Sequence, residues 1–332
     1  MLCPFCLEKK SLNTTKAGCF CGNCREEIHG EYIKYIRRRR IPQTIISAVG
    51  FRGHGKTVFF HSYFYALKET ITREYWEDVY FQALDKNSLV KLWEGIDNLA
   101  KGILPEATPA VFARPTILKF SGLPDFGDRV MVFYDTSGEV FADPDTIPVN
   151  ARFLARSPVI LFLVSISDLM KEKTSDTWQD GLAHLLNAYI IGVTHASLRG
   201  NPRKQDLVVV LTKGDEILDM IDPSVSTYLE TGPIRCYSEN LEHYTDNMEF
   251  ISMDIRNWLR ENNCQLFLNT ADDTFKNVRF TIVSSLGTKP VSDVRMIMPD
   301  DPKRIFDPIL WMMRLQSIQP KWWNFKFRKG QT

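Results

Sequence analysis

Short apolar runs recur along the chain and alternate with longer stretches in which apolar positions repeat at helical spacing. A continuous apolar run bounded by polar residues is typical of a strand that is buried on both faces, as in a parallel sheet. Such runs occupy residues 44–49, 130–134, 157–164, 207–211 and 280–283. Less regular strands are predicted near residues 76–81 and 116–120.

Helices are predicted between these strands, over residues 58–68, 88–101, 178–191, 237–262 and 303–315. In the second of them, apolar residues fall at i, i+3 and i+4 spacing, so we expect one buried face. That face would contain Leu89, Leu92, Trp93, Ile96 and Leu99. Because strands and helices alternate, the pattern predicts an α/β fold with a mostly parallel sheet flanked by helices.

A glycine-rich octet follows the first apolar run and precedes the first helix. It reads Gly50, Phe51, Arg52, Gly53, His54, Gly55, Lys56 and Thr57. The octet matches G-x-x-x-x-G-K-[ST] in the strand–loop–helix context that a phosphate-binding loop needs. Glycines let backbone N–H groups converge on a phosphate, Lys56 adds a positive charge, and the Thr57 hydroxyl can bind Mg²⁺.

Cysteines cluster at the N-terminus, where five of the seven lie within the first 24 residues. Two C-x-x-C pairs are present, Cys3 with Cys6 and Cys21 with Cys24. Cys19 is a fifth candidate that could replace Cys21. Four thiolates suit tetrahedral Zn²⁺, and clustered cysteines without an export signal favour metal over disulfides. We predict a structural zinc ribbon that docks on a partner; the alternatives are a redox pair at Cys3 and Cys6, or surface thiols.

Two basic and aromatic stretches lie outside these motifs. Arg37–Arg40 follow Tyr32 and Tyr35, and the group could contact nucleic acid through phosphates and stacked bases. The favoured interpretation is a solvated linker over residues 31–42. Residues 321–329 combine lysines and arginine with tryptophans and phenylalanines, and could touch a membrane interface or a partner. The favoured interpretation there is a terminal segment anchored by its tryptophans.

Composition is that of an ordinary globular protein. The chain has 332 residues, of which 44% are hydrophobic and 24% charged, with a net charge of +1. A charge so close to zero gives no general attraction to nucleic acid or anionic membranes. No apolar run is long enough to span a membrane, and no signal peptide is evident, so we expect a cytoplasmic protein.

Three polar motifs stand directly after predicted strands. Asp135 ends the second apolar run and Gly138 follows three residues later; in this position an Asp can hold Mg²⁺ and a Gly N–H can meet a γ-phosphate. The next motif is Thr212, Lys213, Gly214 and Asp215. The last is Ser284, Ser285 and Leu286.

With the octet, these motifs resemble those of the Ras-like, translation-factor-related (TRAFAC) class of P-loop GTPases. The resemblance extends over residues 43–290 and covers the base-reading motif [NT]-K-x-D. It implies that Asp215 accepts the guanine N1–H and amine, that Lys213 packs over the base, and that a backbone N–H of the last motif meets guanine O6. A carboxylate suits guanine because adenine lacks that pair of donors. Ser285 replaces the family's usual Ala.

The long stretch between the first helix and Asp135 departs from compact Ras-like proteins. It resembles bacterial GTPases, including double-GTPase families of conflict and defence systems. The family's switch threonine, a second hydroxyl for Mg²⁺, is expected at Thr108, with Thr116 as the alternative. The expected domains are a zinc ribbon (1–30), a basic linker (31–42), a GTPase domain (43–290) and a C-terminal helix with a basic-aromatic tail (291–332).

Two residues depart from the family pattern at the phosphate end. Glu139 stands where many relatives have a Gln that orients water, so it could act as a base, position water, or simply cap the next helix. Arg52 replaces a usual Gly, and could block an arginine finger offered in trans, act as a cation in cis, or face outward. His54 lies in the same loop without an assigned chemistry.

The expected function is therefore a Mg²⁺-dependent GTPase that acts as a molecular switch, with Lys56, Thr108 and Glu139 as catalytic candidates. Its expected cofactors are GTP or GDP, Mg²⁺ and Zn²⁺. Its partners would be an effector or activator protein, and self-association is open. The alternatives are a GTP-binding scaffold that does not hydrolyse, or a nucleic-acid-binding protein that uses the ribbon and Arg37–Arg40.

Overall fold

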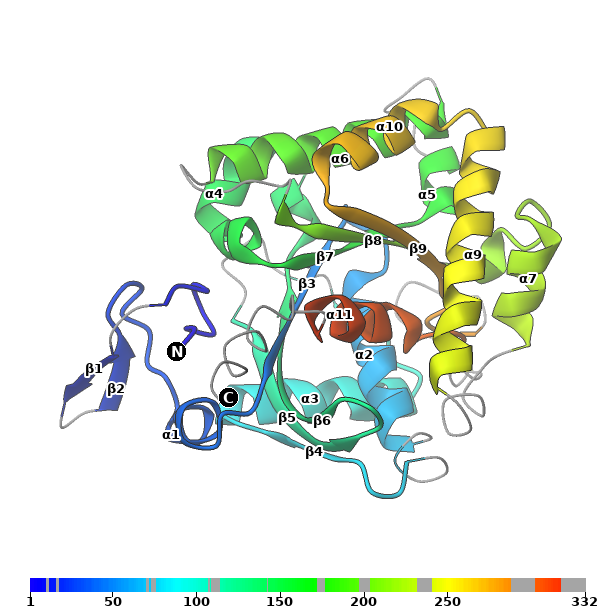
Figure 1. Cartoon of the computed structure of the whole chain (residues 1–332). Coiled ribbons are helices and arrows are strands. Elements are labelled where there is room, and N and C mark those ends of the chain that lie inside the picture. The colour runs from blue at the N-terminus through cyan, green and yellow to red at the C-terminus, as the bar shows by residue number, and fades with distance from the viewer. Residues whose placement is uncertain are drawn as a thin grey trace, which may run out of the picture.

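The structure is a computed structural model of the whole chain (Figure 1). It describes residues 1–9, 12–15, 18–69, 72, 76–106, 108, 114–141, 143–171, 177–196, 204–231, 241–287 and 302–317. The basic-aromatic segment at 321–329 lies outside the described residues.

Seven strands of the described chain form one sheet, in the order β4-β5-β6-β3-β7-β8-β9. Neighbours pair in parallel from β6 through β9, whereas β5 pairs antiparallel with both β4 and β6. The prediction of an α/β fold with a mostly parallel sheet is confirmed. The bounds are β3 Gln43–Val49, β4 Tyr80–Ala83, β5 Thr116–Leu123, β6 Gly127–Asp135, β7 Val159–Val164, β8 Asp206–Leu211 and β9 Asn277–Ile282.

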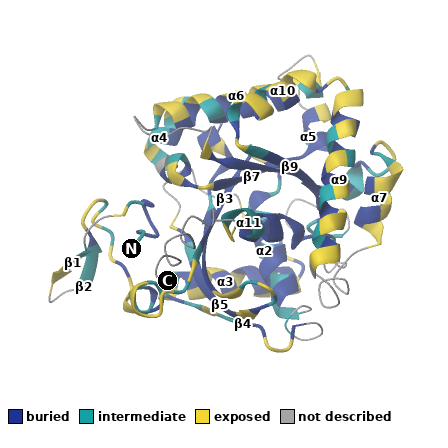
Figure 2. Ribbon diagram, viewed as in Figure 1, coloured by how far each residue is buried: buried dark blue, intermediate teal, exposed yellow. Residues whose placement is uncertain are grey.

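Helices cover both faces of the sheet (Figure 1), and the central strands β3, β7 and β8 are almost wholly buried (Figure 2). Helices α2, α3 and α11 pack on one face, and α6 and α10 on the other. Helix α9 packs along β9, with α7 against it. The bounds are α2 Lys56–Ala66, α3 Lys86–Ala100, α4 Ile147–Asn150, α5 Ile166–Lys171, α6 Trp178–His195, α7 Pro223–Glu230, α9 Leu241–Glu261, α10 Gln265–Thr274 and α11 Asp307–Ser317.

Helix α3 buries a narrower face than its sequence pattern predicted. Leu92, Ile96 and Leu99 are buried, but Leu89 and Trp93 are 45% and 42% exposed. The helix lies beside the antiparallel edge of the sheet, so only one stripe meets the core. The expectation of five buried apolar residues was wrong for these two.

The N-terminal region consists of a small antiparallel hairpin followed by a helical turn. The hairpin pairs β1 (Leu12–Thr15) with β2 (Gly18–Cys21), and helix α1 (Gly30–Ile33) runs into a π-helical turn. Tyr32 and Tyr35 are buried, whereas Arg37–Arg40 are exposed. The predicted solvated stretch is therefore helical, and its tyrosines are not available to stack on bases.

Polar contacts hold the N-terminal region together and join it to the rest of the protein, and the contact with β6 is buried. The Tyr134 hydroxyl, on β6, donates to the carbonyl of Pro4, and its ring stacks on Phe153. The Tyr32 hydroxyl donates to Leu2 O at 2.7 Å, and Arg156 donates to Glu8 at 2.7 Å. The hydrophobic core is continuous from the cysteine turns into the sheet, so the ribbon has a docking surface within its own chain.

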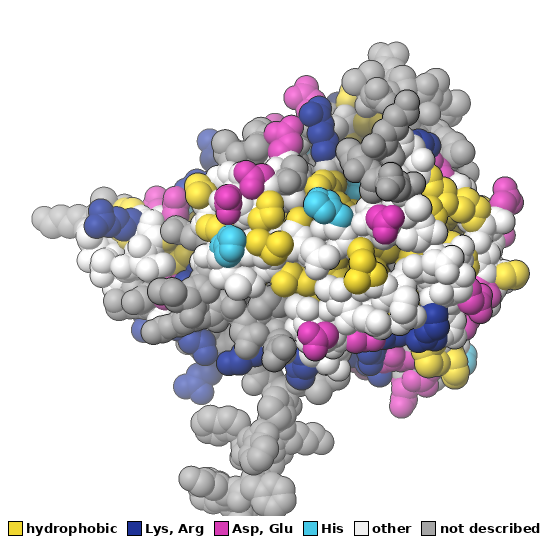
Figure 3. All heavy atoms as spheres, turned by 90° about the horizontal axis from the view of Figure 1, so that it is seen from above, with side chains coloured by type: hydrophobic (Ala, Val, Ile, Leu, Met, Phe, Trp, Pro, Cys, Tyr) yellow, Lys and Arg dark blue, Asp and Glu magenta, His cyan; other side chains and the backbone are white. Residues whose placement is uncertain are grey.

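Several apolar side chains on the far side of the helical layer face outward. Val149, Ile191 and Leu266 are exposed on α4, α6 and α10. Figure 3 shows hydrophobic side chains interspersed with histidines and acidic residues on the face seen from above. Isolated exposed apolar residues of this kind are normal on folded proteins.

We predict that Tyr134→Phe lowers the free energy of unfolding by about 1–3 kcal/mol, because the buried Pro4 carbonyl loses its donor while the ring stacking persists. Urea unfolding of the zinc-loaded protein measures this. An unchanged unfolding midpoint would mean that the contact does not hold the ribbon on the sheet.

Candidate functional site

Parallel pairing brings the predicted motifs to one edge of the sheet. The carboxyl ends of β3, β6, β7, β8 and β9 point the same way, and each is followed by a polar loop. The chain leaves β3 toward β4–β6 on one side and later returns to β7 on the other. Ligands of open α/β sheets bind in the crevice at such a switch point.

The glycine loop after β3 needs glycine for reasons that the backbone makes explicit. Gly50 has φ 155°, and a Cβ there would lie 2.3 Å from the Leu163 carbonyl oxygen. Gly53 and Gly55 have φ of 86° and 78°, in the left-handed region. Gly55 is the N-cap of α2, so the loop ends at the helix terminus that favours anions.

The Lys56 side chain folds back beneath this loop and hydrogen-bonds to the carbonyl groups of the loop itself. Its Nζ donates to Gly50 O at 2.6 Å and to Phe51 O at 2.8 Å. Burial lowers the pKa of Lys56 to about 8, although nearby Asp135 acts in the opposite direction. A buried ammonium whose hydrogen bonds go to neutral carbonyl groups is well suited to an incoming anion.

Two hydroxyls and a carboxylate meet beside Lys56. The hydroxyls of Thr57 and Thr108 are 2.7 Å apart, and Thr108 donates to Asp135 Oδ2 at 3.3 Å. Asp135 Oδ1 is buried and has no hydrogen-bond partner within the described part of the chain. Burial raises the pKa of Asp135, against the opposing effect of Lys56.

This oxygen cluster fits a hard divalent cation. Hydroxyl and carboxylate oxygens are the ligands that Mg²⁺ accepts, and a cation or its water would satisfy the orphaned Oδ1. Thr116, the alternative to Thr108, lies within β5 and pairs with Phe133, so it is not part of the cluster.

The loop after β6 packs directly on the glycine loop. A Cβ on Gly138 would lie 2.1 Å from the Arg52 backbone nitrogen, so only glycine allows this approach. The adjoining side chains form an ion pair, with Arg52 Nη1 3.2 Å from Glu139 Oε1. Both side chains are more than half exposed, so this pair contributes little to stability.

Two neighbouring cavities open along this edge. One, of about 270 Å³, is lined by residues of the glycine loop together with Thr108, Gly138 and Glu139. The other, of about 310 Å³, is lined by Thr212, Lys213, Asp215, Ser285 and Leu286. Gly53, Gly55 and Val58 line both cavities, so the two form adjacent compartments.

The second compartment is tied to the glycine loop and to the loop after β9. The Thr212 hydroxyl donates to His54 O at 3.0 Å, and the Ser284 hydroxyl donates to Asp215 Oδ1 at 2.6 Å. His54 is buried, and burial lowers the pKa of its imidazole to about 4. His54 therefore contributes a neutral side chain and a backbone carbonyl that joins the two loops.

Asp168 is a site residue that the sequence reasoning missed. It follows β7, on α5, and its Oδ2 accepts from Lys213 Nζ at 2.7 Å. Lys213 itself adopts a left-handed conformation with φ 54°, which turns the chain sharply after β8. The available signal was a carboxylate shortly after an apolar run, as at Asp135.

The four predicted cysteine ligands converge at the N-terminus. The Sγ atoms of Cys3, Cys6, Cys21 and Cys24 all lie within 4.8 Å of one another. Cys3–Cys24 and Cys6–Cys21 are separated by 3.7 and 3.8 Å, close to the roughly 3.8 Å expected around tetrahedral zinc with 2.3 Å bonds. The cluster could hold a metal such as zinc.

Cys19 does not belong to this cluster. Its Sγ lies 3.7 Å from the Thr14 hydroxyl across the hairpin. The two cysteine turns are also alike: Phe5 N donates to Cys3 Sγ and Asn23 N to Cys21 Sγ, at 3.3 and 3.4 Å. Such backbone donors stabilise thiolate ligands.

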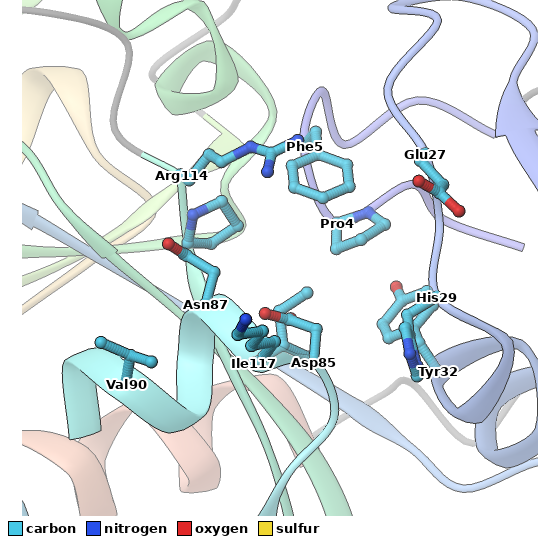
Figure 4. A pocket seen from close by; sticks show the side chains of 12 residues that line it. Pro4, Phe5, Glu27, His29, Tyr32, Asp85, Asn87, Val90, Arg114 and Ile117 are labelled. Carbon is cyan, nitrogen blue, oxygen red and sulfur yellow. The ribbon is translucent and has the colours of Figure 1, made fainter. Parts of the chain in front are cut away.

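A further cavity, of about 460 Å³, lies between the ribbon and α3 and not at the motif edge (Figure 4). Two of the charged residues that line it, Asp85 and Arg114, already have partners within the protein. Asp85 caps α3 through Ser88, and Arg114 bonds Glu26 at 2.7 Å while lying over the Phe5 ring. We therefore place the candidate site in the two smaller compartments, where Lys56 and Asp135 are poorly satisfied.

Comparison with known proteins does not identify the chain. No family model and no curated protein matches it. Among solved structures, a crystal structure of a mutation variant of SsGBP is similar, with a TM-score of 0.34 and 12% identity. The match covers 86% of this chain and 61% of the other. Across the residues that the structure describes, no helix combines the length and apolar character needed to span a membrane.

Metal binding can be tested with a matched pair of cysteine variants. Cys21→Ser removes a ligand and should lower bound zinc from about one ion per chain and reduce the thermal unfolding temperature, because ribbon folding depends on the metal. Cys19→Ser should leave both unchanged. Zinc content by mass spectrometry and thermal unfolding measure the effect, and equal behaviour of the two variants would contradict this ligand set.

Proposed function

We propose that the protein binds GTP with Mg²⁺ and hydrolyses it to GDP and phosphate as a molecular switch. One observation carries the proposal: the glycine loop, the Asp135 loop and the Asp215 loop converge along one edge as two adjoining compartments. The compartment at the glycine loop offers the Lys56 ammonium and hard oxygen ligands, and the other compartment offers the Asp215 carboxylate and Lys213. This division suits a nucleoside triphosphate.

The triphosphate would lie against the glycine loop and the N-terminus of α2. Lys56 would exchange its two carbonyl partners for phosphate oxygens, which relieves the cost of its burial. Thr57, Thr108 and Asp135 would hold Mg²⁺, which neutralises charge that develops on the phosphates. The Gly138 backbone N–H would meet the terminal phosphate.

The base would occupy the second compartment. Asp215 would accept the two guanine donors through its carboxylate, Lys213 would pack over the ring, and the loop at Ser285 and Leu286 would offer a backbone N–H. Asp168 would hold Lys213 in place, because it already pairs with the lysine Nζ at 2.7 Å. Adenine would leave the Asp215 carboxylate without matching donors.

The Arg52–Glu139 ion pair bears on the hydrolysis step. While Glu139 is held by Arg52, its carboxylate is not free to orient water, and a terminal phosphate would compete for the same guanidinium. The same observation favours a second candidate function, GTP binding without hydrolysis, in which partners read the bound nucleotide. Arg37–Arg40 remain an exposed basic run, but burial of Tyr32 and Tyr35 weakens the nucleic-acid alternative.

Asp215→Asn tests the base assignment. The variant should weaken GTP binding about 10- to 100-fold, as expected for losing about 1.5–3 kcal/mol of charge-assisted hydrogen bonding. It should gain affinity for xanthosine triphosphate, since xanthine presents an acceptor where guanine has its amine. Equilibrium binding of fluorescent nucleotides measures both changes.

Glu216→Gln is the matched control, because Glu216 lines the same compartment but pairs with Lys171. It should retain GTP preference. An equal loss in both variants would indicate a general charge effect and would remove Asp215 from base recognition.

The overall activity is tested by single-turnover phosphate release from GTP, with protein in excess and Mg²⁺ present. Release that disappears in Lys56→Ala would support the GTPase proposal. Tight GTP binding without release would support the binding-only function, and absence of any nucleotide binding would refute both. A rate that rises with protein concentration would add self-association to the mechanism.

A further inference from the structure

The chain segment before α11 returns to the loop that follows β9. Ser284 N donates to Lys303 O at 3.1 Å, and Lys303 N donates to Ser284 O at 2.8 Å. The Ser284 hydroxyl in turn donates to Asp215 Oδ1 at 2.6 Å. Lys303 therefore fixes both the N–H and the carbonyl group of Ser284. The Ser284 side chain meanwhile contacts Asp215, the candidate base-reading carboxylate.

A buried polar network fixes this returning segment. The carboxylate of Asp307, which is fully buried, accepts from the hydroxyls of Tyr228, at 2.6 Å, and Tyr244. Arg304 donates through Nη1 to the Tyr244 hydroxyl at 3.0 Å and through Nε to Tyr228 O at 2.8 Å. Its guanidinium also stacks 3.5 Å from the centre of the Tyr228 ring.

This network joins three elements that surround the base side of the site. Tyr228 belongs to α7, Tyr244 to α9, and Asp307 begins α11, which Figure 1 shows alongside α2 on the same face of the sheet. Arg304 adopts a left-handed backbone with φ 57°, which a non-glycine residue keeps only when its surroundings enforce it. The strained backbone and the buried contacts of Arg304 therefore fix the position of its neighbour, Lys303.

The two tyrosines remain hydrogen-bond donors in this setting. Burial raises the pKa of Tyr228 well above its usual range, and the Asp307 charge adds to the effect. Both hydroxyls donate to the Asp307 carboxylate, and hydrogen bonds from a hydroxyl to a carboxylate are among the stronger ones in proteins. Fully satisfied buried networks of this kind specify one arrangement of their surroundings.

We propose that Arg304, Asp307 and Tyr244 are positioning residues for base selection, acting through Lys303 and Ser284 on the Asp215 carboxylate. The inference rests on the proposed function and deepens it. The network lies on the base side of the site, because its hydrogen bonds run through Arg304 and Lys303 to Ser284 and so to Asp215. Loosening it should therefore reduce discrimination between guanine and adenine nucleotides and spare binding to the phosphates.

Tyr244→Phe is the sharpest test because it removes one hydroxyl and keeps the ring. Tyr189→Phe is the matched control: its hydroxyl is also buried and bonds Gln205 at 3.1 Å, next to the start of β8 and so at the opposite end of that strand from Asp215. Tyr244→Phe removes a hydroxyl that donates to Asp307 and accepts from Arg304, and Tyr189→Phe removes one that donates to Gln205, so both variants should lose stability. Only Tyr244→Phe should alter base choice.

The measurement is equilibrium binding of GTP, ATP and inorganic tripolyphosphate in the presence of Mg²⁺, with thermal unfolding alongside. Tyr244→Phe should lower the GTP-over-ATP affinity ratio about five- to tenfold, or roughly 1 kcal/mol, and leave tripolyphosphate binding unchanged. Asp307→Asn, which weakens both tyrosine bonds, should lower the ratio further. Tyr189→Phe should keep the wild-type ratio.

The outcomes separate this inference from the proposed function. If the wild-type protein binds no guanine nucleotide in preference to ATP, the proposed function fails. If it does, and Tyr244→Phe and Asp307→Asn both keep the wild-type ratio, the positioning role is wrong while the function stands. Equal loss of GTP and tripolyphosphate binding would also overturn the inference, because it would indicate general destabilisation.

Discussion

Parallel pairing of β6, β3, β7, β8 and β9 is the constraint on which the candidate site depends. Parallel strands require that each be followed by a crossover, so every loop after a carboxyl end lies at the same edge. Residues that are far apart in sequence, such as Lys56 and Asp215, thereby become neighbours, and the hydrogen bond from Thr212 to His54 O joins their loops. The order of the strands then decides which loops are neighbours. Because β3 lies between β6 and β8 in the sheet, the glycine loop lies between the loops of Asp135 and Asp215.

The charged groups at this edge of the sheet are incompletely paired, and the missing partners indicate what kind of ligand the edge would bind. Lys56 is buried with carbonyl partners, and the buried Oδ1 of Asp135 has no hydrogen-bond partner among the residues that the structure describes. Desolvation lowers the pKa of the lysine and raises that of the carboxyl group, so each charge is disfavoured where it stands. A bound anion together with a divalent cation would correct both. A purely structural pair would have been expected to bond directly.

Sequence patterns predicted the parts of this structure that depend on local chemistry. Buried parallel strands are continuous apolar runs in the sequence. A loop that needs glycines at left-handed φ shows them at a fixed spacing, which the sequence motif reveals. The C-x-x-C spacing also favoured Cys21 over Cys19 as a metal ligand, and the cluster contains Cys21 while Cys19 lies across the hairpin near Thr14. The outward position of Trp93 depended on which part of the sheet α3 would cover.

Contacts made by residues without a motif were the least predictable. Asp168 reaches Lys213 only because β7 and β8 are neighbours, and Lys303 reaches Ser284 only because α11 folds back under the sheet. Such pairings are set by tertiary packing and leave no periodic trace in the sequence. They therefore emerge only once the strands and helices have been placed.

The two ends of the described chain are fastened to strands that carry the site. Tyr134, which holds the ribbon through Pro4, directly precedes Asp135, and Lys303 pairs with Ser284 directly after β9. Neighbouring residues on a strand point to opposite faces, so the ribbon is anchored on one side of β6 while Asp135 faces the cavity. Moving β6 would therefore disrupt the buried contact that holds the ribbon, so the position of Asp135 and that of the ribbon depend on each other.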